Sequence, residues 1–165
     1  MERNMSENNT ENIQPQIEDK IKEALNGEAL RNALDFVAFL KDIGMTPCPE
    51  NPYARFRYKD YYTCIVLYPF PENGWIIGDC PVDETDGFLL EESVKEFVWE
   101  NIVSCCGGCG CPEWKKEKDR TIFGKKYKSV CSCTVQFHNP DADALIKIKK
   151  LMELWIHIMD DSMKS

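Results

Sequence analysis

The sequence predicts an α+β domain, in which an antiparallel sheet of four to five strands carries its helices mainly on one face. Two observations support this prediction. Apolar residues recur at helical spacing in several segments, and between them the period changes to two, so the order is helix, strands, helix, strands, helix. This grouping differs from the strict strand and helix alternation of a parallel sheet. At 165 residues the chain suits one domain.

The N-terminal part predicts a tail followed by two helices. Residues 1–14 contain few apolar side chains and should form a disordered tail, so the domain is assigned to residues 15–165. A short helix is expected over residues 17–25. A longer one is expected over residues 28–43, where Gly44 favours the C-terminal turn.

A proline-rich loop around Cys48 and an antiparallel meander are expected next. Alternating or β-branched and aromatic residues predict strands at 55–58, 61–68 and 75–80. If helices cover one face of the sheet, the other face becomes a shallow aromatic surface. Its candidate residues are Tyr61, Tyr62, Tyr68 and Trp75.

The C-terminal half predicts two more helices around a hairpin. An amphipathic helix is expected over residues 89–103, and strands at 121–123 and 127–138. The last helix opens at Asn139 as the cap residue, with Pro140 and an acid following it in the first turn.

Composition indicates a cytoplasmic protein. The N-terminus lacks the apolar middle of a secretory signal, and no apolar run approaches the ~20 residues that cross a bilayer. In a reducing compartment, thiols bind metals, perform redox chemistry or pack in the core. The net charge of −8 argues against broad nucleic-acid binding.

Six of the nine cysteines lie in two clusters, at residues 105–111 and 131–133. A tetrahedral zinc site needs about four thiolates from short segments that meet in space. Cys106 and Cys109 have the spacing of a zinc knuckle, and their two intervening glycines allow the tight turn. The predicted zinc ligands are Cys106, Cys109, Cys111 and Cys131.

The exact ligand set stays open at this stage. Cys80, Cys105 or Cys133 could each replace one of the four. Strand alternation places Cys131 and Cys133 on the face of Val135 and Phe137, so Cys133 is equally a core thiol. Independent packing thiols or reversible disulfides remain an alternative, and four cysteines would also accept an iron–sulfur cluster.

Two rival functions follow from the same region. Cys106 and Cys109 form a C-x-x-C, the motif of thiol-redox proteins, although here it follows the end of a predicted helix, where the dipole favours a cation over a free thiolate. A nucleic-acid accessory role would use the basic segment 115–128. Its cations are Lys115, Lys116, Lys118, Arg120, Lys125, Lys126 and Lys128.

No catalytic site is predicted. His138 closes a predicted strand just before a helix cap, and His157 lies on the predicted C-terminal helix among apolar residues, so we interpret both as structural or exposed. Phosphate-loop, nucleotide-binding glycine, nucleophile-elbow and zinc-protease motifs are missing from the sequence.

Several motifs together resemble an uncharacterised bacterial domain family, sometimes attached to transcription regulators. They comprise residues 34–37 with Gly44, the stretch 118–131 with its Ile-Phe-Gly-Lys core, and Asn139-Pro140-Asp141. The resemblance spans residues 34–154.

In that family a C-x-x-C-x-x-C loop precedes one later cysteine, which implies Cys106, Cys109, Cys111 and Cys131 as the matching positions. This chain has one residue fewer before Cys111 and extra cysteines at 105 and 133. The family implies no activity. The sequence therefore predicts a zinc-stabilised module that binds a small molecule or protein.

Overall fold

The computed structural model describes residues 16–49, 54–59, 61–70, 72, 74–78, 89–104 and 118–164. These residues form an antiparallel sheet in the order β1-β2-β3-β4-β7-β5, and β6 pairs with β7 outside this path. The strands are β1 (Met45–Pro49), β2 (Ala54–Tyr58), β3 (Tyr61–Phe70), β4 (Gly74–Gly78), β5 (Ile102–Ser104), β6 (Lys118–Ile122) and β7 (Lys125–His138). The predicted tail at 1–14 lies outside the described residues.

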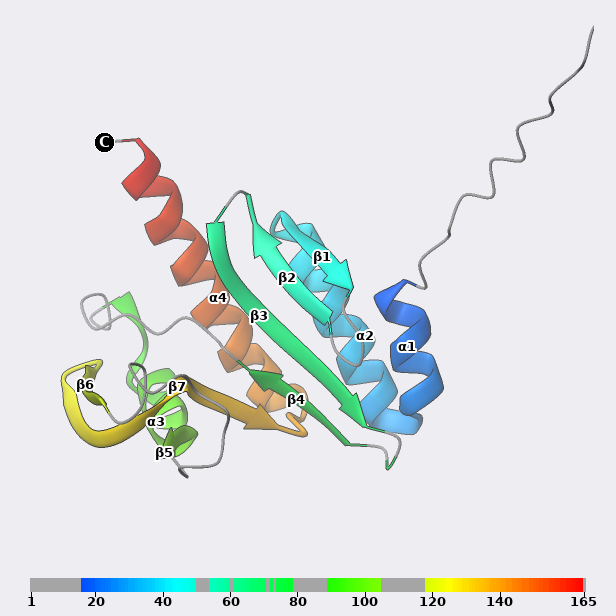
Figure 1. The fold of residues 1–165 in the computed structure, drawn as a ribbon, viewed down its shortest axis with the longest axis horizontal. Coiled ribbons are helices and arrows are strands. Elements are labelled where there is room, and N and C mark those ends of the chain that lie inside the picture. The colour runs from blue at the N-terminus through cyan, green and yellow to red at the C-terminus, as the bar shows by residue number, and fades with distance from the viewer. Residues whose placement is uncertain are drawn as a thin grey trace, which may run out of the picture.

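The helices cover one face of this sheet, as Figure 1 shows from the opposite face. They are α1 (Ile17–Ala24), α2 (Gly27–Asp42), α3 (Glu92–Glu100) and α4 (Ala142–Met163). Helices α2 and α4 pass behind β1 to β4, and α3 packs against α4 beside the long strand β7. The predicted α+β class, with helices mainly on one face, is confirmed.

The core lies between the sheet and these helices. Phe36 of α2 packs on Trp75 of β4, with ring centroids 6.5 Å apart. Phe97 of α3 stacks on Phe137 of β7 at 5.0 Å. Trp155 of α4 meets Tyr58 of β2 edge to face at 5.9 Å. Each helix except α1 therefore contributes one aromatic contact that fixes its position on the sheet.

Trp75 corrects the predicted aromatic surface. Its side chain is 1% exposed and lies on the helix-covered face, whereas the prediction placed it on the other face. Trp75 pairs with Pro69, and Ile77 pairs with the buried Leu67. Because side chains alternate along a strand, Trp75 and Ile77 face the helices, and Ile76 between them faces the other side. The side chains of Tyr61, Tyr62 and Tyr68 lie outside the described set.

The first strand replaces a predicted loop. Residues 45–49 pair with β2 along their whole length, although Pro47 and Pro49 suggested a break. Proline is tolerated in an edge strand because its missing N–H can face away from the partner. Strand β1 is such an edge.

The third helix is shorter than predicted. It ends at Glu100, and Asn101 closes it by donating from Nδ2 to the carbonyl oxygen of Phe97 at 2.7 Å. Ile102 then pairs with Val135 in a strand. The β-branched Ile102 and Val103 favour extended backbone, which explains the change from helix to strand.

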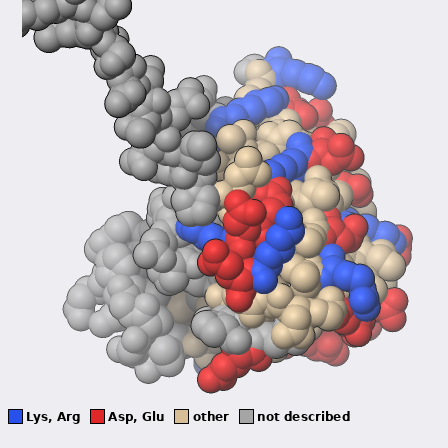
Figure 2. Space-filling model, turned by 90° about the vertical axis from the view of Figure 1, so that its right-hand side faces the viewer, with Lys and Arg blue, Asp and Glu red and all other residues tan. Residues whose placement is uncertain are grey.

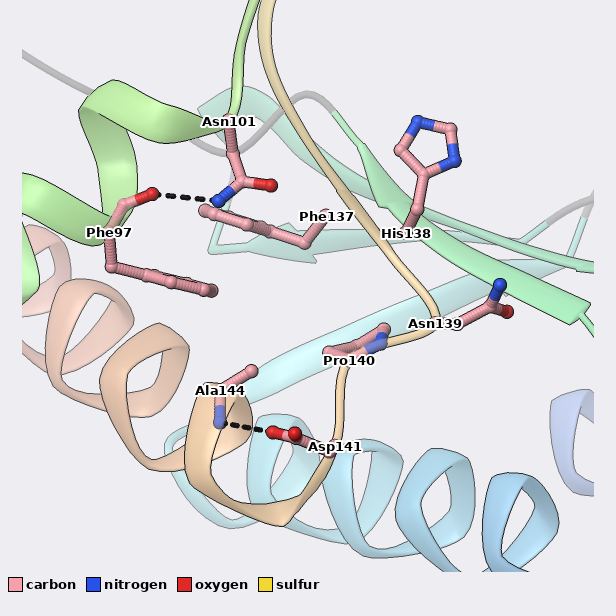
Figure 3. A pocket seen from close by; sticks show the side chains of 8 residues that line it. All are labelled: Phe97, Asn101, Phe137, His138, Asn139, Pro140, Asp141 and Ala144. Atoms are coloured by element: carbon pink, nitrogen blue, oxygen red, sulfur yellow. Dashed lines mark hydrogen bonds between the residues drawn. The ribbon is translucent and has the colours of Figure 1, made fainter.

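The last helix is capped by Asp141 and not by Asn139. The Asp141 carboxylate accepts a hydrogen bond from the Ala144 N–H at 2.8 Å, the side-chain cap of α4 (Figure 3). Asn139 instead has a positive φ of 45° and bonds Trp75 twice, from its N–H to the Trp75 carbonyl at 2.8 Å and from the Trp75 N–H to its Oδ1 at 2.7 Å. It therefore ends the β4–β7 pairing and turns the chain into α4.

The turn after β2 is held to α4 by polar contacts. Asp160 accepts hydrogen bonds from Lys59 Nζ at 2.8 Å and from the Tyr58 hydroxyl at 2.7 Å. The hydrogen bond from Lys59, followed by that from Tyr58, lowers the pKa of the Asp160 carboxyl. Within the described ranges, no helix is long and apolar enough to span a membrane.

Candidate metal centre

The two ends of the first cysteine segment are held at one residue of β7. Ser104, the last described residue before it, pairs with Val130 from one side. Lys118, the first described residue after it, pairs with the same Val130 from the other side. Neighbouring strands lie ~4.8 Å apart, which puts these two ends roughly 10 Å from each other across one strand.

Cys131 follows directly after this anchor point. It is 2% exposed, as is Val130. The other predicted ligands, Cys106, Cys109 and Cys111, lie outside the described residues, as do Cys80, Cys105 and the side chain of Cys133. Within the part of the chain that is described, no three His, Cys, Asp or Glu side chains form a group that could hold a metal ion.

Strand β7 is irregular where Cys131 lies. From Ile102 to Ser104, β5 advances two residues, while the paired positions on β7 run from Val135 to Val130. Thr134, inside this interval, has a φ of 55° and is nevertheless buried. Such a bulge bends a strand and re-aims its side chains.

This bulge removes the basis for one sequence prediction. Regular alternation was to place Cys131 and Cys133 on the face of Val135 and Phe137. Instead Val130 and Cys131 are both buried although adjacent, and so are Thr134 and Val135. Strand parity therefore does not assign a face to these cysteines.

Side chains of β6 hold both left-handed residues of β7. Arg120 donates from Nη1 to the hydroxyl oxygen of Thr134. Asp119 Oδ1 accepts from the backbone N–H of Ser129 at 3.2 Å, and Ser129 has a φ of 53°. The bulge is thus braced by its neighbouring strand, and a guanidinium lies on its flank.

Two of the described cations of the basic segment make contacts within the chain. Lys125 lies over the Trp99 ring at 5.2 Å and near the Tyr127 ring at 5.7 Å, while Arg120 is bound to Thr134. Lys126 and Lys128 are exposed. Lys115 and Lys116 lie outside the described residues, so the nucleic-acid hypothesis stays a prediction.

Helix α3 ends earlier in the chain, and so further from the cysteine segment, than the sequence predicted. The predicted helix was to end beside the cysteines, but α3 ends at Glu100 and the strand Ile102–Ser104 intervenes. A helix dipole acts mainly within the last turn. The predicted preference for a bound cation over a free thiolate therefore no longer follows from the position of the helix, and the redox role also stays a prediction.

Cys131 lines neither of two cavities that the described residues form. One of about 170 Å³ lies at the start of α4 (Figure 3) and is lined by Phe97, Asn101, Phe137, His138, Asn139, Pro140, Asp141 and Ala144. Its Asn101 amide and Asp141 carboxylate already bond the backbone, and the His138 side chain points away from the cavity. This arrangement offers no converging polar groups for catalysis.

The second cavity is an open groove of about 470 Å³ between the start of α3 and the second half of α4. It is lined by Leu89, Leu90, Glu91, Val94, Lys150, Glu153, Leu154 and His157. Glu91 and Lys150 form an ion pair of 2.6 Å across it. His157 is exposed and lies 3.3 Å from the carboxylate of Asp161, as expected of a surface histidine.

Comparison with known proteins adds no further assignment. No protein-family model, no curated protein and no solved structure matches the chain. The resemblance to an uncharacterised bacterial family therefore stays a prediction.

Proposed function

We propose that the protein is a cytoplasmic module stabilised by one zinc ion, which Cys106, Cys109, Cys111 and Cys131 bind as thiolates. The observation that supports it most is the double pairing of Val130. Ser104 and Lys118 both lie beside this residue, which immediately precedes Cys131.

The chain between Ser104 and Lys118 is long enough to bring its cysteines to Cys131. Cys111 is seven residues from Ser104 and seven from Lys118, so it stands at the middle of the intervening segment. Seven residues span at most about 25 Å when fully extended, while the two ends are roughly 10 Å apart. The length of this segment is therefore sufficient for its cysteines to reach the vicinity of Cys131.

Charge near the bulge fits such a site. Four thiolates and one Zn²⁺ carry a formal charge of −2, which a nearby cation and hydrogen-bond donors offset. The Arg120 guanidinium donates to Thr134, which lies three residues after Cys131 in the chain, and so supplies a positive charge at the bulge. The positive charge of Arg120 would favour negatively charged thiolates near the bulge.

The proposed role of the ion is structural. Thiolates at 106–111 and at Cys131 would link the cysteine segment to β7, the strand with which Ser104 and Lys118 pair. The free energy of metal binding would then add to the free energy of folding. The module would use its remaining surface to bind a small molecule or a protein.

Metal content of the native protein tests this proposal. Elemental analysis of protein purified without added metal is expected to give about one zinc per chain, because structural thiolate sites retain zinc tightly. Cys131→Ser should lower that ratio clearly. Cys48→Ser is the matched control, because Cys48 lies on β1 at the far edge of the sheet, and it should leave the ratio unchanged.

Three results would contradict the proposal. One is metal-free native protein whose nine thiols all react freely. Another is iron with visible charge-transfer absorption, which indicates a cluster in place of zinc. The third is metal-free protein in which Cys106 alone reacts at low pH, as a redox thiolate would.

A further inference from the structure

We propose that Arg120 is a positioning residue of the zinc site, which closes a bend in β7 and thereby sets the orientation of Cys131. The inference rests on the proposed function, because it concerns the same site. Arg120 is not itself a ligand. It acts through Thr134, whose hydroxyl oxygen accepts a hydrogen bond from Arg120 Nη1.

Two residues with left-handed backbone interrupt β7. Five of the described residues other than glycine have a positive φ, and three of these directly follow the last residue of a strand. These three are Lys59, Phe123 and Asn139. Ser129 and Thr134, with φ of 53° and 55°, instead lie within β7, one on each side of Cys131.

Thr134 is the less suited of the two to this backbone. A β-branched residue at positive φ is a genuine outlier, because its side chain crowds the backbone there. Thr134 is also buried, at 5% exposure. Strained backbone of this kind persists only where its surroundings hold it, and it occurs most often at functional sites. The hydrogen bond from Arg120 supplies such support.

The same hydrogen bond bridges a bend in β7. Arg120 of β6 pairs with Tyr127, yet its side chain reaches Thr134, seven residues further along β7. Seven residues of straight strand span roughly 23 Å, which is more than an arginine side chain can reach. Strand β7 must therefore curve between these positions, and Figure 1 shows the curve in the yellow part of the strand. Cys131 lies inside this curved interval.

Strand β6, which carries Arg120, is itself fixed to α3. Trp99 of α3 donates from Nε1 to the carbonyl oxygen of Ile122 at 2.7 Å. The Lys125 ammonium, at the start of β7, lies over the same Trp99 ring at 5.2 Å. Strand β6 is therefore a firm base from which Arg120 holds Thr134 and keeps the bend closed.

A closed bend favours metal binding in two ways. A ligand that is already held in place loses less conformational freedom when the ion binds. The guanidinium at the bulge also offsets part of the negative charge of the thiolates. Replacing a group that supports a metal ligand from outside typically lowers metal affinity roughly 10- to 100-fold.

The zinc affinity of the full-length protein, measured by competition with a chromophoric chelator, tests the role of Arg120. Arg120→Ala should weaken zinc binding roughly 10-fold or more. Arg120→Lys should recover part of this loss, because lysine keeps the charge but lacks the planar fork of donors. Thr134→Val keeps the branched shape and removes the hydroxyl acceptor, so it should weaken zinc binding by a similar factor to Arg120→Ala.

The double variant shows whether Arg120 acts through Thr134. If it does, combining Arg120→Ala with Thr134→Val should weaken zinc binding about as much as either change alone, because the two residues form one contact. The urea midpoint of the metal-free protein should move little in these variants, because release of the strained backbone offsets the lost hydrogen bond. A merely structural role would lower the midpoint and the zinc affinity together. If Arg120→Ala does not fold, Arg120→Lys and Thr134→Val give the same comparison.

A general effect of charge is the alternative explanation. The chain carries −8, and viewed from the side of α1 its Lys and Arg lie among Asp and Glu (Figure 2). Replacing any one cation by alanine makes the chain more negative by the same amount. Lys126→Ala is the matched control, because Lys126 is exposed on the same hairpin. It should leave the zinc affinity unchanged.

The zinc site and the role of Arg120 fail on different results. Native protein without zinc would overturn both. Zinc bound by four sulfurs in the wild type, together with an Arg120→Ala variant that binds zinc as tightly, would overturn the role of Arg120 alone. An equal loss in Lys126→Ala, multiplied losses in the double variant, or a fall in the urea midpoint that accounts for the whole loss of affinity would do the same.

Discussion

Removing zinc with a chelator is expected to lower the free energy of unfolding by several kcal/mol. A ligand that binds only the folded state contributes about 4 kcal/mol when its free concentration exceeds the dissociation constant 1,000-fold, and this stabilisation is lost with the metal. Urea unfolding of the zinc-loaded and chelated protein measures the difference.

Loss of the metal should first loosen the strands next to the proposed site. Strands β5 and β6 pair with β7 at the two ends of the cysteine segment, so their amides should exchange faster after chelation. Amides of α2, on the opposite part of the sheet, should keep their protection. Cys131→Ala should reproduce this pattern without chelator, and Cys48→Ala should not. Equal loosening of α2 and β5, or no change at all, would contradict a site at this position.

Replacing Trp75 by alanine is expected to cost about 3–5 kcal/mol, the usual range for removing a large buried aromatic side chain. Trp75 is 1% exposed and packs on Phe36 of α2. Its two hydrogen bonds to Asn139 use backbone atoms and survive the substitution, so the loss measures core packing. Thermal or urea unfolding gives the value.

The neighbouring residue provides the control. Ile76 lies one position further along β4, is half-buried and faces away from the helices. Ile76→Ala should cost less than half as much as Trp75→Ala, because it removes fewer buried contacts. Comparable small losses at both positions would mean that Trp75 lies on the open face, as the sequence alone suggested.

The case of Trp75 shows where sequence patterns stop being informative. The run from Trp75 to Ile77 is apolar at every position, so a period of two has no visible phase. The helices, by contrast, show clear apolar stripes beside charged faces. The ends predicted for α1, α2 and α3 lie within three residues of the observed ends.

Two local features needed tertiary information. The prolines of β1 read as a loop because the sequence does not reveal which strand will be an edge. The bulge of β7 has Ser129 and Thr134 at positive φ, where glycine or asparagine would have been the usual signal. Its brace, Arg120, comes from a neighbouring strand.

The candidate site was predicted from cysteine spacing alone, and the structure adds its framework. The cysteine spacing identified the segment and the returning strand. It did not show that Ser104 and Lys118 pair with the same residue, because pairing partners across strands are set by the whole sheet.

X-ray absorption at the zinc edge of the native protein tests the central claim most directly. Four sulfur atoms at about 2.3 Å are expected around zinc in the wild type. In Cys131→Ser the signal should fall to three sulfurs with an oxygen or nitrogen in the fourth place. A wild-type spectrum dominated by oxygen or nitrogen, or a Cys131→Ser spectrum that keeps all four sulfurs, would contradict the account.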